Sequence, residues 1–356
     1  MAIPDLLEDK DNLDIIESLV KGESVTLNYS ELGRILEKNR GTVQNRVEKL
    51  LKNNIIEPPS FPFYYIFSAY PLLMITNMDI PDCEECNPRI HKWIREENRI
   101  VASYKCEQGE YGSLIFSLHE SLMRGHEWMA KIPYVLEKQY NVERTHATFN
   151  SNTVYVSNQL MLKYEPSTCV KILEREQEKG ELELCGYPLD KLDLTIIKTL
   201  LSGEGIKYNR NKIHKQTGLH YKTIKKRVDA LLENKILLSP VCNFPNLFTP
   251  PGQLLSYMFL KVEYGDESEV NSLMSNVDMS VIWKSISSKY NMLGFHIHKD
   301  LNDLYGELSP SDGCYTIIEN AQVRYLSPLP LKRFNFKDLS LDYITSQKEK
   351  IKNLQD

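Results

Sequence analysis

The fold is decided by residues 187–240, which read YPLDKLDLTIIKTLLSGEGIKYNRNKIHKQTGLHYKTIKKRVDALLENKILLSP. Apolar residues recur every three or four positions in three short segments of this stretch, a spacing typical of amphipathic helices. The third segment is crowded with lysine. We therefore expect three short helices, the last of which carries a basic outer face.

The same pattern occurs once more, 181 residues earlier, in residues 9–55. The two copies align without a gap, so that Thr42 corresponds to Thr223 and Arg46 to Arg227. A repeat whose period is the size of a domain indicates duplication rather than a solenoid. We therefore expect two similar units in tandem.

Composition places the chain among ordinary globular proteins. Its 356 residues suit roughly two to four small domains. The sequence has neither a run of about 18 apolar residues that would span a membrane nor a signal peptide, so we expect a cytoplasmic protein with no membrane partner. Seven dispersed cysteines argue against a disulfide framework. A net charge of −5 gives no support to a general nucleic-acid coat protein, although a local basic face can still bind DNA.

Each copy is predicted to form a helix-turn-helix. In the first copy we expect helices over residues 11–20, 30–36 and 41–53, with Ser30 capping the second of them. In a helix-turn-helix the last helix enters the major groove of DNA. Both third helices are therefore candidate recognition helices.

A mixed pattern of strands and helices follows each copy. After the first copy we expect strands over 63–78, 100–106, 111–118 and 142–157, and helices over 87–97 and 121–139. After the second copy we expect strands over 254–264, 281–288, 292–298 and 315–326, and helices over 268–276 and 301–308. The order βαββαβ is the ferredoxin-like arrangement, which predicts an α+β fold class.

The resulting domain prediction has two units, a connector and a tail. The connector is expected to contain a polar helix, and the tail a frayed one. The predicted boundaries are 1–57 for the first winged helix-turn-helix, 58–157 for the first ferredoxin-like module, 158–187 for the connector, 188–247 for the second winged helix-turn-helix, 248–330 for the second ferredoxin-like module and 331–356 for the tail.

The run LDKLDLTII at 189–197, the turn glycine Gly218 and the run TIKKRVDAL at 223–231 together resemble the leucine-responsive/asparagine regulator (Lrp/AsnC) family. The resemblance covers nearly everything except the connector and the tail. It implies a winged helix-turn-helix joined to a regulatory module that dimerises and binds an amino acid or similar small effector. On this basis the chain resembles two such units fused head to tail, a pseudo-dimer that could also form a homodimer.

Two departures from the family pattern affect these expectations. The turn glycine is replaced by Glu37 in the first copy; a left-handed conformation is costly for glutamate, so we expect that turn to differ. The family's Gly-x-Tyr-Asp hairpin reads Gly-Glu-Tyr-Gly at 109–112 and Ser-Lys-Tyr-Asn at 288–291. The missing acidic residue argues against amino-acid sensing through the usual contacts.

The second copy carries the stronger signal for DNA binding. Nine basic residues and only two acidic ones lie between Lys207 and Lys235, and each contact with a phosphate adds affinity without sequence preference. Ile224, Val228 and Leu231 are spaced to pack inward. The candidate DNA-binding residues are Tyr221, Lys222, Thr223, Lys225, Lys226, Arg227 and Lys212. The alternative is a solvated lysine-rich helix.

The first copy has a different outer face. Gln and Asn can read adenine and Arg can read guanine, while nearby glutamates dilute the charge. We expect a weaker and more discriminating binder, or a degenerate copy kept for packing. Its candidate residues are Arg40, Thr42, Gln44, Asn45, Arg46 and Lys49. Arg46 and Arg227 fit a phosphate contact and a structural ion pair equally well.

Other residues carry weaker signals. Cys83 and Cys86 form the one close cysteine pair in the sequence, and free thiols are favoured over a metal or redox site. His296 and His298 alternate on a strand, which favours a solvated or dimer-facing surface over a ligand site. The aromatic run at 61–67 is interpreted as hinge packing. We predict no cofactor and no metal.

The leading hypothesis is a sequence-specific transcription regulator without enzymatic activity, whose partner is double-stranded DNA. A second hypothesis is a tetrapyrrole enzyme, because some siroheme decarboxylases resemble the same family and consist of two fused units. Tyr-Asn-Met-Leu at 290–293 resembles their Tyr-Asn-Leu-Trp segment, but the expected His and Arg are replaced by Ser-Ile-Ser-Ser at 285–288. A third is a winged-helix scaffold for protein interactions.

Overall fold

The protein is described from a computed structural model. The described residues are 6–21, 29–53, 55–56, 66–79, 88–107, 112–142, 148–149, 154–157, 161–164, 173–175, 177–178, 180, 182–184, 186–201, 210–234, 236, 254–263, 267–275, 279–285, 289–308, 318–327, 330–332 and 336–355. The chain divides into two compact units, which we describe separately. The helical unit comprises residues 1–69, 173–245 and 336–356, and the sheet unit comprises residues 70–172 and 246–335. This mixture of helices and antiparallel sheets confirms the predicted α+β class.

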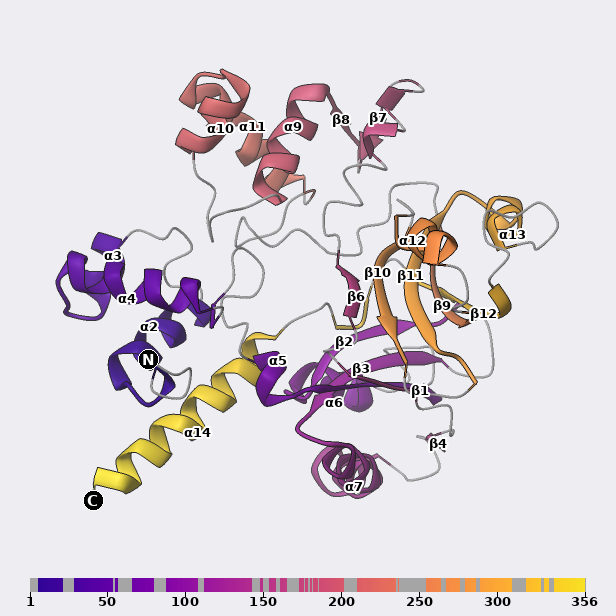
Figure 1. The fold of residues 1–356 in the computed structure, drawn as a ribbon, viewed down its shortest axis with the longest axis horizontal. Coiled ribbons are helices and arrows are strands. Elements are labelled where there is room, and N and C mark those ends of the chain that lie inside the picture. The colour runs from indigo at the N-terminus through magenta and orange to yellow at the C-terminus, as the bar shows by residue number, and fades with distance from the viewer. Residues whose placement is uncertain are drawn as a thin grey trace. The chain divides into compact units, whose positions relative to one another are not determined.

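The first head of the helical unit consists of α2 (Lys10–Lys21), α3 (Tyr29–Ile35) and α4 (Arg40–Lys52) (Figure 1). Asp9 begins α2, because its side chain accepts hydrogen bonds from the backbone N–H groups of residues 11 and 12. Asn39 begins α4 in the same manner. The predicted cap Ser30 lies inside α3 instead, since that helix starts one residue earlier. The apolar stripes meet in a core that contains Leu13, Ile16, Leu32, Val43, Val47 and Leu50.

The second head consists of α9 (Lys191–Leu201), α10 (Arg210–Thr217) and α11 (Tyr221–Glu233). Asp190 caps α9 through the backbone N–H groups of residues 192 and 193. Ile224, Val228 and Leu231 are buried, as the helical spacing predicted. A short hairpin of β7 (Leu182–Leu184) and β8 (Tyr187–Leu189) precedes this head, at the end of the expected connector.

The turn before the last helix has a residue in the left-handed conformation at the same position in both heads. Gly218 has φ +69°, and Glu37 has φ 54° at the equivalent position. The expectation that the first turn would differ is therefore wrong. Lys38 N–H donates to the carbonyl of Gly33 at 2.7 Å, and a Cβ on Gly33 would lie 2.6 Å from the carbonyl oxygen of Lys38. The close packing of this turn holds glutamate in a left-handed conformation that costs about 1–2 kcal/mol.

Two segments of the helical unit differ from the sequence prediction. Residues 66–69 form the short helix α5 (Ile66–Ala69), where a strand was expected. The C-terminal tail is the 19-residue helix α14 (Lys337–Gln355), which packs on α2. The Lys348 ammonium pairs with Asp14 at 2.6 Å and also with Glu17. The tail is thus a docked element of the first head rather than a frayed helix.

The first module of the sheet unit follows the order strand, helix, strand, strand, helix, strand. Its strands are antiparallel, in the spatial order β2-β3-β1, with β4 and β5 both pairing with β1. Its elements are β1 (Leu72–Asp79), α6 (Pro88–Glu96), β2 (Ile100–Lys105), β3 (Ser113–His119), α7 (Leu122–Tyr140), β4 (Thr148–Phe149) and β5 (Val154–Ser157).

The second module repeats this order. Its sheet has the spatial order β12-β9-β11-β10-β6, in which β6 (Met161–Tyr164) comes from the chain segment that follows the first module. Its other elements are β9 (Leu254–Val262), α12 (Glu267–Ser275), β10 (Met279–Lys284), β11 (Met292–His298), α13 (Leu301–Leu308) and β12 (Ile318–Leu326).

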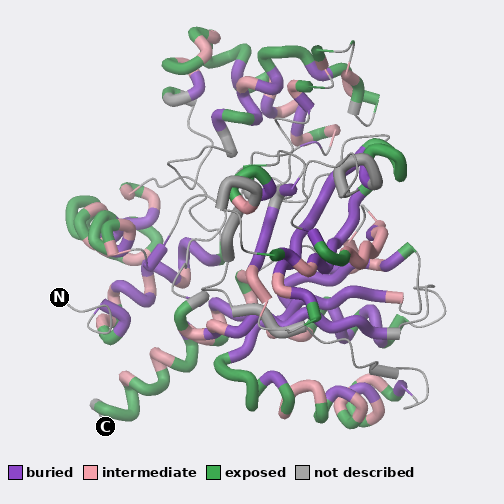
Figure 2. The backbone as a smooth tube through the Cα atoms, turned by 45° about the vertical axis from the view of Figure 1, so that its right-hand side comes forward, coloured by how far each residue is buried: buried purple, intermediate pink, exposed green. Residues whose placement is uncertain are grey.

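Each sheet has a helix-covered face and an inner face. On the covered face of the first sheet, Trp93, Ile115, Ile132 and Leu136 belong to one apolar cluster. The inner faces meet through aromatic rings: Phe116 of β3 lies 5.3 Å from Phe295 of β11 and 5.5 Å from Tyr257 of β9, measured between ring centroids. Figure 2 shows these strands as the largest continuous buried region.

The modules are also joined by strand pairing. Residues 161–164 of the first module's trailing segment form β6, which pairs with the edge strand β10 of the second sheet. In return, two isolated β-bridges join Ser103 of β2 to Lys332, and Cys106, directly after β2, to Leu326 at the end of β12. Ser103 N–H donates to the carbonyl of Lys332 at 2.8 Å, and Lys332 N–H donates to the carbonyl of Ser103 at 3.1 Å. The segment after the first module thus adds a strand to the second sheet, and isolated bridges from the second module reach the edge of the first sheet.

Among the described residues, no helix is long and apolar enough to cross a membrane.

Candidate nucleic-acid interface

The outer face of α11 is basic over its first two turns. Lys222, Lys225 and Lys226 are exposed, and none of them has an acidic partner among the described residues. Tyr221 is 40% exposed, and its ring packs against that of His214 in a tilted arrangement, with 4.6 Å between the ring centroids. Thr223 is exposed between these residues. Lys212 belongs to α10, but its side chain lies outside the described part of the structure.

Two histidines that the sequence prediction did not single out fix the start of α11. His220 is the N-cap, and its Nδ1 accepts the backbone N–H of Lys222 at 3.2 Å. His214 lies on α10, and its Nδ1 contacts the carbonyl of Leu219 at 2.8 Å. The position of His220 directly before a helical stripe was the available signal. Together they set the direction in which the basic turn points.

Arg227 faces the interior of the head. Its guanidinium contacts Asp190 at 2.7 Å and Asp193 at 2.8 Å, which ties α11 to the first turn of α9. The hydrogen bond that Arg227 donates to Asp190 is the main cause that raises the pKa of Arg227. Burial acts to raise the pKa of Asp190, but its bond to Arg227 and two backbone N–H bonds lower it below the usual range. Asp193 is 1% exposed, and its burial raises its pKa even beside Arg227.

Arg46 makes the equivalent contacts in the first head. It donates to Asp9 at 2.6 Å and to Asn12 at 2.8 Å, so that Asn12 stands where the second head has Asp193. A further contact joins Arg46 to Asp11 at 3.1 Å. Of the two interpretations left open by the sequence, the structure shows the ion pair for both arginines.

The outer face of α4 carries less free charge. Arg40, Thr42, Asn45 and Lys49 are exposed. Gln44 is half-buried, and its amide donates to Glu48 on the same helix at 2.9 Å. The two heads thus present different side chains on the same frame.

The remaining candidates do not form a second site. Cys83, Cys86 and the aromatic run at 61–65 lie outside the described residues. The expectation that His296 and His298 face solvent or a dimer partner is wrong, since each is 1% exposed on the helix-covered face of β11 and their Nδ1 atoms are 3.2 Å apart. Within the described ranges, no three His, Cys, Asp or Glu side chains cluster as a metal site would require.

The Tyr-Asn-Met-Leu segment at 290–293 lies entirely within the described residues. The Asn291 amide bonds both backbone groups of Val262, donating to the carbonyl at 2.7 Å and accepting the N–H at 2.8 Å. Tyr290 is buried beside Phe259 at 5.8 Å. Both side chains therefore have a place in the packing of the second sheet.

Comparison with known proteins gave matches among solved structures. No family model matches the chain, and no curated protein matches it. The crystal structure of the siroheme decarboxylase NirDL matches at 11% identity and a TM-score of 0.39, covering 97% of this chain and 99% of that chain. A transcriptional regulator from Neisseria meningitidis, solved with L-Met, matches at 14% identity with a TM-score of 0.21. This match covers 42% of this chain and 88% of the regulator. AsnC from E. coli matches at 16% identity with a TM-score of 0.20, and the match covers 41% of this chain and 89% of AsnC.

The prediction that the chain is not an enzyme is contradicted by the match that spans nearly the full length of both chains, because that protein is a siroheme decarboxylase. The prediction rested on the DNA-binding signal of the second copy and on the replacement of the expected His and Arg by Ser-Ile-Ser-Ser at 285–288. Folds host unrelated functions, and function depends on the site. We do not retain it.

Proposed function

We propose that this protein is a sequence-specific DNA-binding transcription regulator of the Lrp/AsnC type. Each head is a winged helix-turn-helix joined to a ferredoxin-like module, and the fused chain is a pseudo-dimer. The second head is the main DNA-binding element. The observation that carries the proposal is the cluster of exposed lysines Lys222, Lys225 and Lys226 on the first two turns of α11.

The position of these lysines is what makes them a DNA-binding face. In a helix-turn-helix the recognition helix contacts base edges through residues near its N-terminus. The buried residues Ile224 and Val228 fix the opposite side of α11 in the core, so the three ammonium groups are turned outward together. An ammonium group without a carboxylate partner can neutralise a phosphate and release its counterion.

Arg227 has a positioning role in this proposal. Its bonds to Asp190 and Asp193 hold α11 at a fixed angle to α9, while its neighbours reach the groove. Tyr221 packs against His214 and offers its ring edge and hydroxyl to bases. Thr223 and Lys212 complete the contact set of this head.

The first head contributes discrimination more than affinity. Arg40, Asn45 and Gln44 have the hydrogen-bonding groups that read guanine and adenine. Because the two recognition helices carry different side chains, the target is asymmetric rather than a strict palindrome. The addition of β6 to the second sheet, together with the bridges from the second module to the edge of the first sheet, supports a single chain that acts as its own dimer. A small-molecule effector is part of the same proposal.

The test is duplex binding by fluorescence anisotropy as a function of salt. We expect a selected target to bind at least 100-fold more tightly than random duplex. Reversing the lysines in a Lys222→Glu/Lys225→Glu/Lys226→Glu variant should lower affinity far more than the matched reversal of Arg40, Lys49 and Lys52, which are exposed on α4. Equal affinity for target and random duplex would overturn the specific-regulator proposal, and equal losses would overturn the division between the heads.

The same protein should be titrated with a metallated tetrapyrrole and followed by absorbance. The regulator proposal predicts target binding that needs no tetrapyrrole. A tight stoichiometric tetrapyrrole complex, together with no measurable preference for any duplex, would replace the proposal with an enzymatic function.

A further inference from the structure

The outer face of α4, the recognition helix of the first head, carries a carboxylate that has no cation beside it. Glu48 is exposed, and among the described residues it forms no ion pair. It accepts a hydrogen bond from Nε2 of Gln44 at 2.9 Å. On a helix that contacts DNA, such a negative charge repels phosphate and lowers affinity. Glu48 therefore contributes something other than affinity.

The bond to Glu48 determines which way the amide of Gln44 faces. A carboxylate can only accept hydrogen bonds, so the group that approaches it is the NH2 of Gln44 and not the carbonyl. The NH2 has two hydrogens, and with one of them bonded to Glu48 the other remains beside Oε1. This free edge of Gln44 has one donor and one acceptor side by side. That pair matches the N7 acceptor and the N6 donor of adenine.

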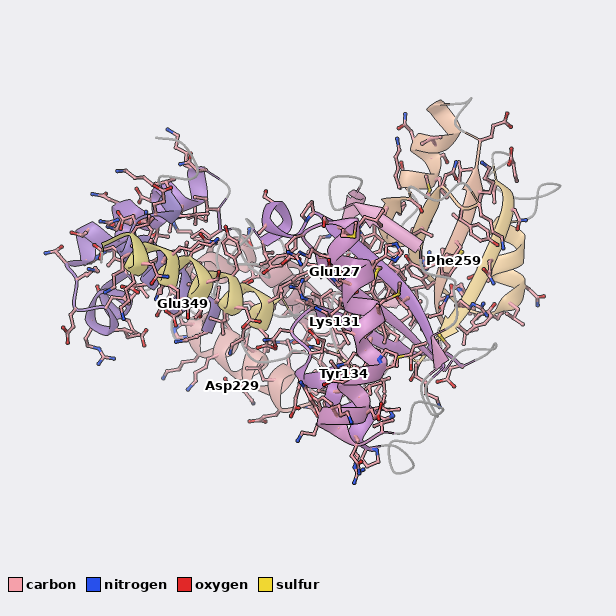
Figure 3. All side chains as sticks on the ribbon, turned by 90° about the horizontal axis from the view of Figure 1, so that it is seen from below. Glu127, Lys131, Tyr134, Asp229, Phe259 and Glu349 are labelled. Atoms are coloured by element: carbon pink, nitrogen blue, oxygen red, sulfur yellow. The ribbon has the colours of Figure 1, made fainter. Side chains whose placement is uncertain are left out.

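The second head does not have this bond. Lys225 and Asp229 are at the equivalent positions of α11, and Figure 3 labels Asp229 among the side chains of this helix. Within the described part of the chain these two side chains form no ion pair with each other. A lysine ammonium has donors but no acceptor, so it cannot make the same paired contact with adenine. The oriented amide is therefore particular to the first head.

We propose that Glu48 is a positioning residue that holds the amide of Gln44 for contact with an adenine in the DNA target. The inference rests on the proposed function and names the base that the first head reads through Gln44. Nε2 of Gln44 donates to N7 of the adenine, and Oε1 accepts from N6. Guanine has the acceptor O6 where adenine has the N6 donor, so a fixed carbonyl rejects guanine. An amide that is free to rotate would turn its NH2 toward O6 and accept both purines.

Glu48 should therefore have opposite effects on affinity and on base preference. A well-formed contact with adenine discriminates roughly 5- to 150-fold against the wrong base. Part of this preference is lost when the amide is free to rotate. The repulsion between Glu48 and phosphate is independent of sequence, so removing the carboxylate tightens binding to every duplex. A glutamate with only a structural role would not lower the preference for one base while raising affinity in general.

The test is a set of single-base substitutions in the selected target duplex, measured with the full chain by fluorescence anisotropy. Gln44→Ala identifies the position that Gln44 reads, and we expect that base to be adenine. At this position Glu48→Leu should lower the preference for adenine over guanine at least about 5-fold, while binding to random duplex tightens about 2-fold. In the Gln44→Ala background Glu48→Leu should change the preference no further, because Glu48 acts through Gln44.

Asp229→Leu is the matched control, because it removes the same charge from the equivalent position of the second head. It should leave the preference at the position read by Gln44 unchanged. Hydrogen exchange of α4 in each variant shows whether the helix stays folded, which separates a lost contact from a lost helix.

Three results would overturn the proposal. The first is a preference for adenine that survives Glu48→Leu. The second is an equal loss from Glu48→Leu in the Gln44→Ala background, since Glu48 would then act on the base directly. The third is a base other than adenine at the position that Gln44 reads. In each case the wild type still prefers its target to random duplex, whereas failure of the proposed function would remove that preference altogether.

Discussion

Arg46 and Arg227 are about equally exposed, at 26% and 24% of their side-chain surface, but they pair with different residues. The effect of removing each arginine on stability can therefore be compared within one chain. We predict that Arg227→Met destabilises the second head by about 3–5 kcal/mol, the usual cost of leaving a buried carboxylate unpaired. Asp193 is 1% exposed and would lose its cation. Arg46→Met should cost about 1–2 kcal/mol, because it strands the neutral Asn12 and two carboxylates that are about a third exposed, 37% and 34%.

The direction of the pH dependence follows from the pKa of Asp193. Burial already raises this pKa above its usual value, and the loss of Arg227 would raise it further. A group whose pKa is raised in the folded state stabilises the fold at pH values below its unfolded pKa, and this stabilisation is lost as the pH rises through the folded pKa. The loss of stability that Arg227→Met causes in the second head should therefore grow as the pH rises from about 4 to about 7.

Hydrogen exchange measured by mass spectrometry suits this comparison, because it resolves each head in the intact chain. A loss of 3 kcal/mol corresponds to roughly 100-fold faster opening of α9 and α11. A second substitution, Asp193→Asn, copies the first head's Asn12 and should recover most of the loss in the Arg227→Met background. Equal changes in the two heads, or no rescue by Asp193→Asn, would refute the argument. A drop in DNA affinity with unchanged exchange would instead make Arg227 a direct phosphate ligand.

Three further predictions concern packing. Glu37→Gly should stabilise the first head by up to about 1 kcal/mol, measured by exchange of α3 and α4, because φ 54° suits glycine; a loss of stability would show that the glutamate side chain is needed. Gly294→Ala should cost about 1–3 kcal/mol in thermal unfolding, since its Cβ would lie 3.0 Å from the backbone carbonyl oxygen of Val281, which strand pairing holds in place; an unchanged melting temperature would contradict this. Lys348→Glu should release α14 from α2 by repelling Glu17, seen as fast exchange confined to α14; unaltered protection would mean that apolar contacts alone hold the helix.

Much of the fold could be predicted because local periodicity is strong in this chain. The expected bounds of β11 and α13 are those found, and the outward and inward residues of α11 follow from helical spacing. The failures depend on contacts that are distant in sequence. The polar tail gives no local reason to dock, yet Lys348 finds two carboxylates on α2 more than 300 residues away.

The candidate site shows the same limit. Sequence alone could place Arg46 and Arg227 at equivalent positions, but it could not decide whether they face phosphate or protein, because the deciding carboxylates lie 37 positions earlier in each head. Likewise, the alternation of His296 and His298 fixed a shared face of β11. Which face the helices cover is a property of the whole module, so their burial could not be predicted.

The pairing between the modules has a consequence for how the protein is made. Cys106, directly after the edge strand β2, forms a bridge with Leu326, but Leu326 emerges about 220 residues later, a delay of roughly 10–45 s at ordinary translation rates. During that time the outer edge of β2 has unpaired backbone N–H and C=O groups, which can pair with other chains that are being translated from the same messenger RNA. We therefore expect the yield of folded protein to rise when the growing chain is shielded, for example by a ribosome-associated chaperone.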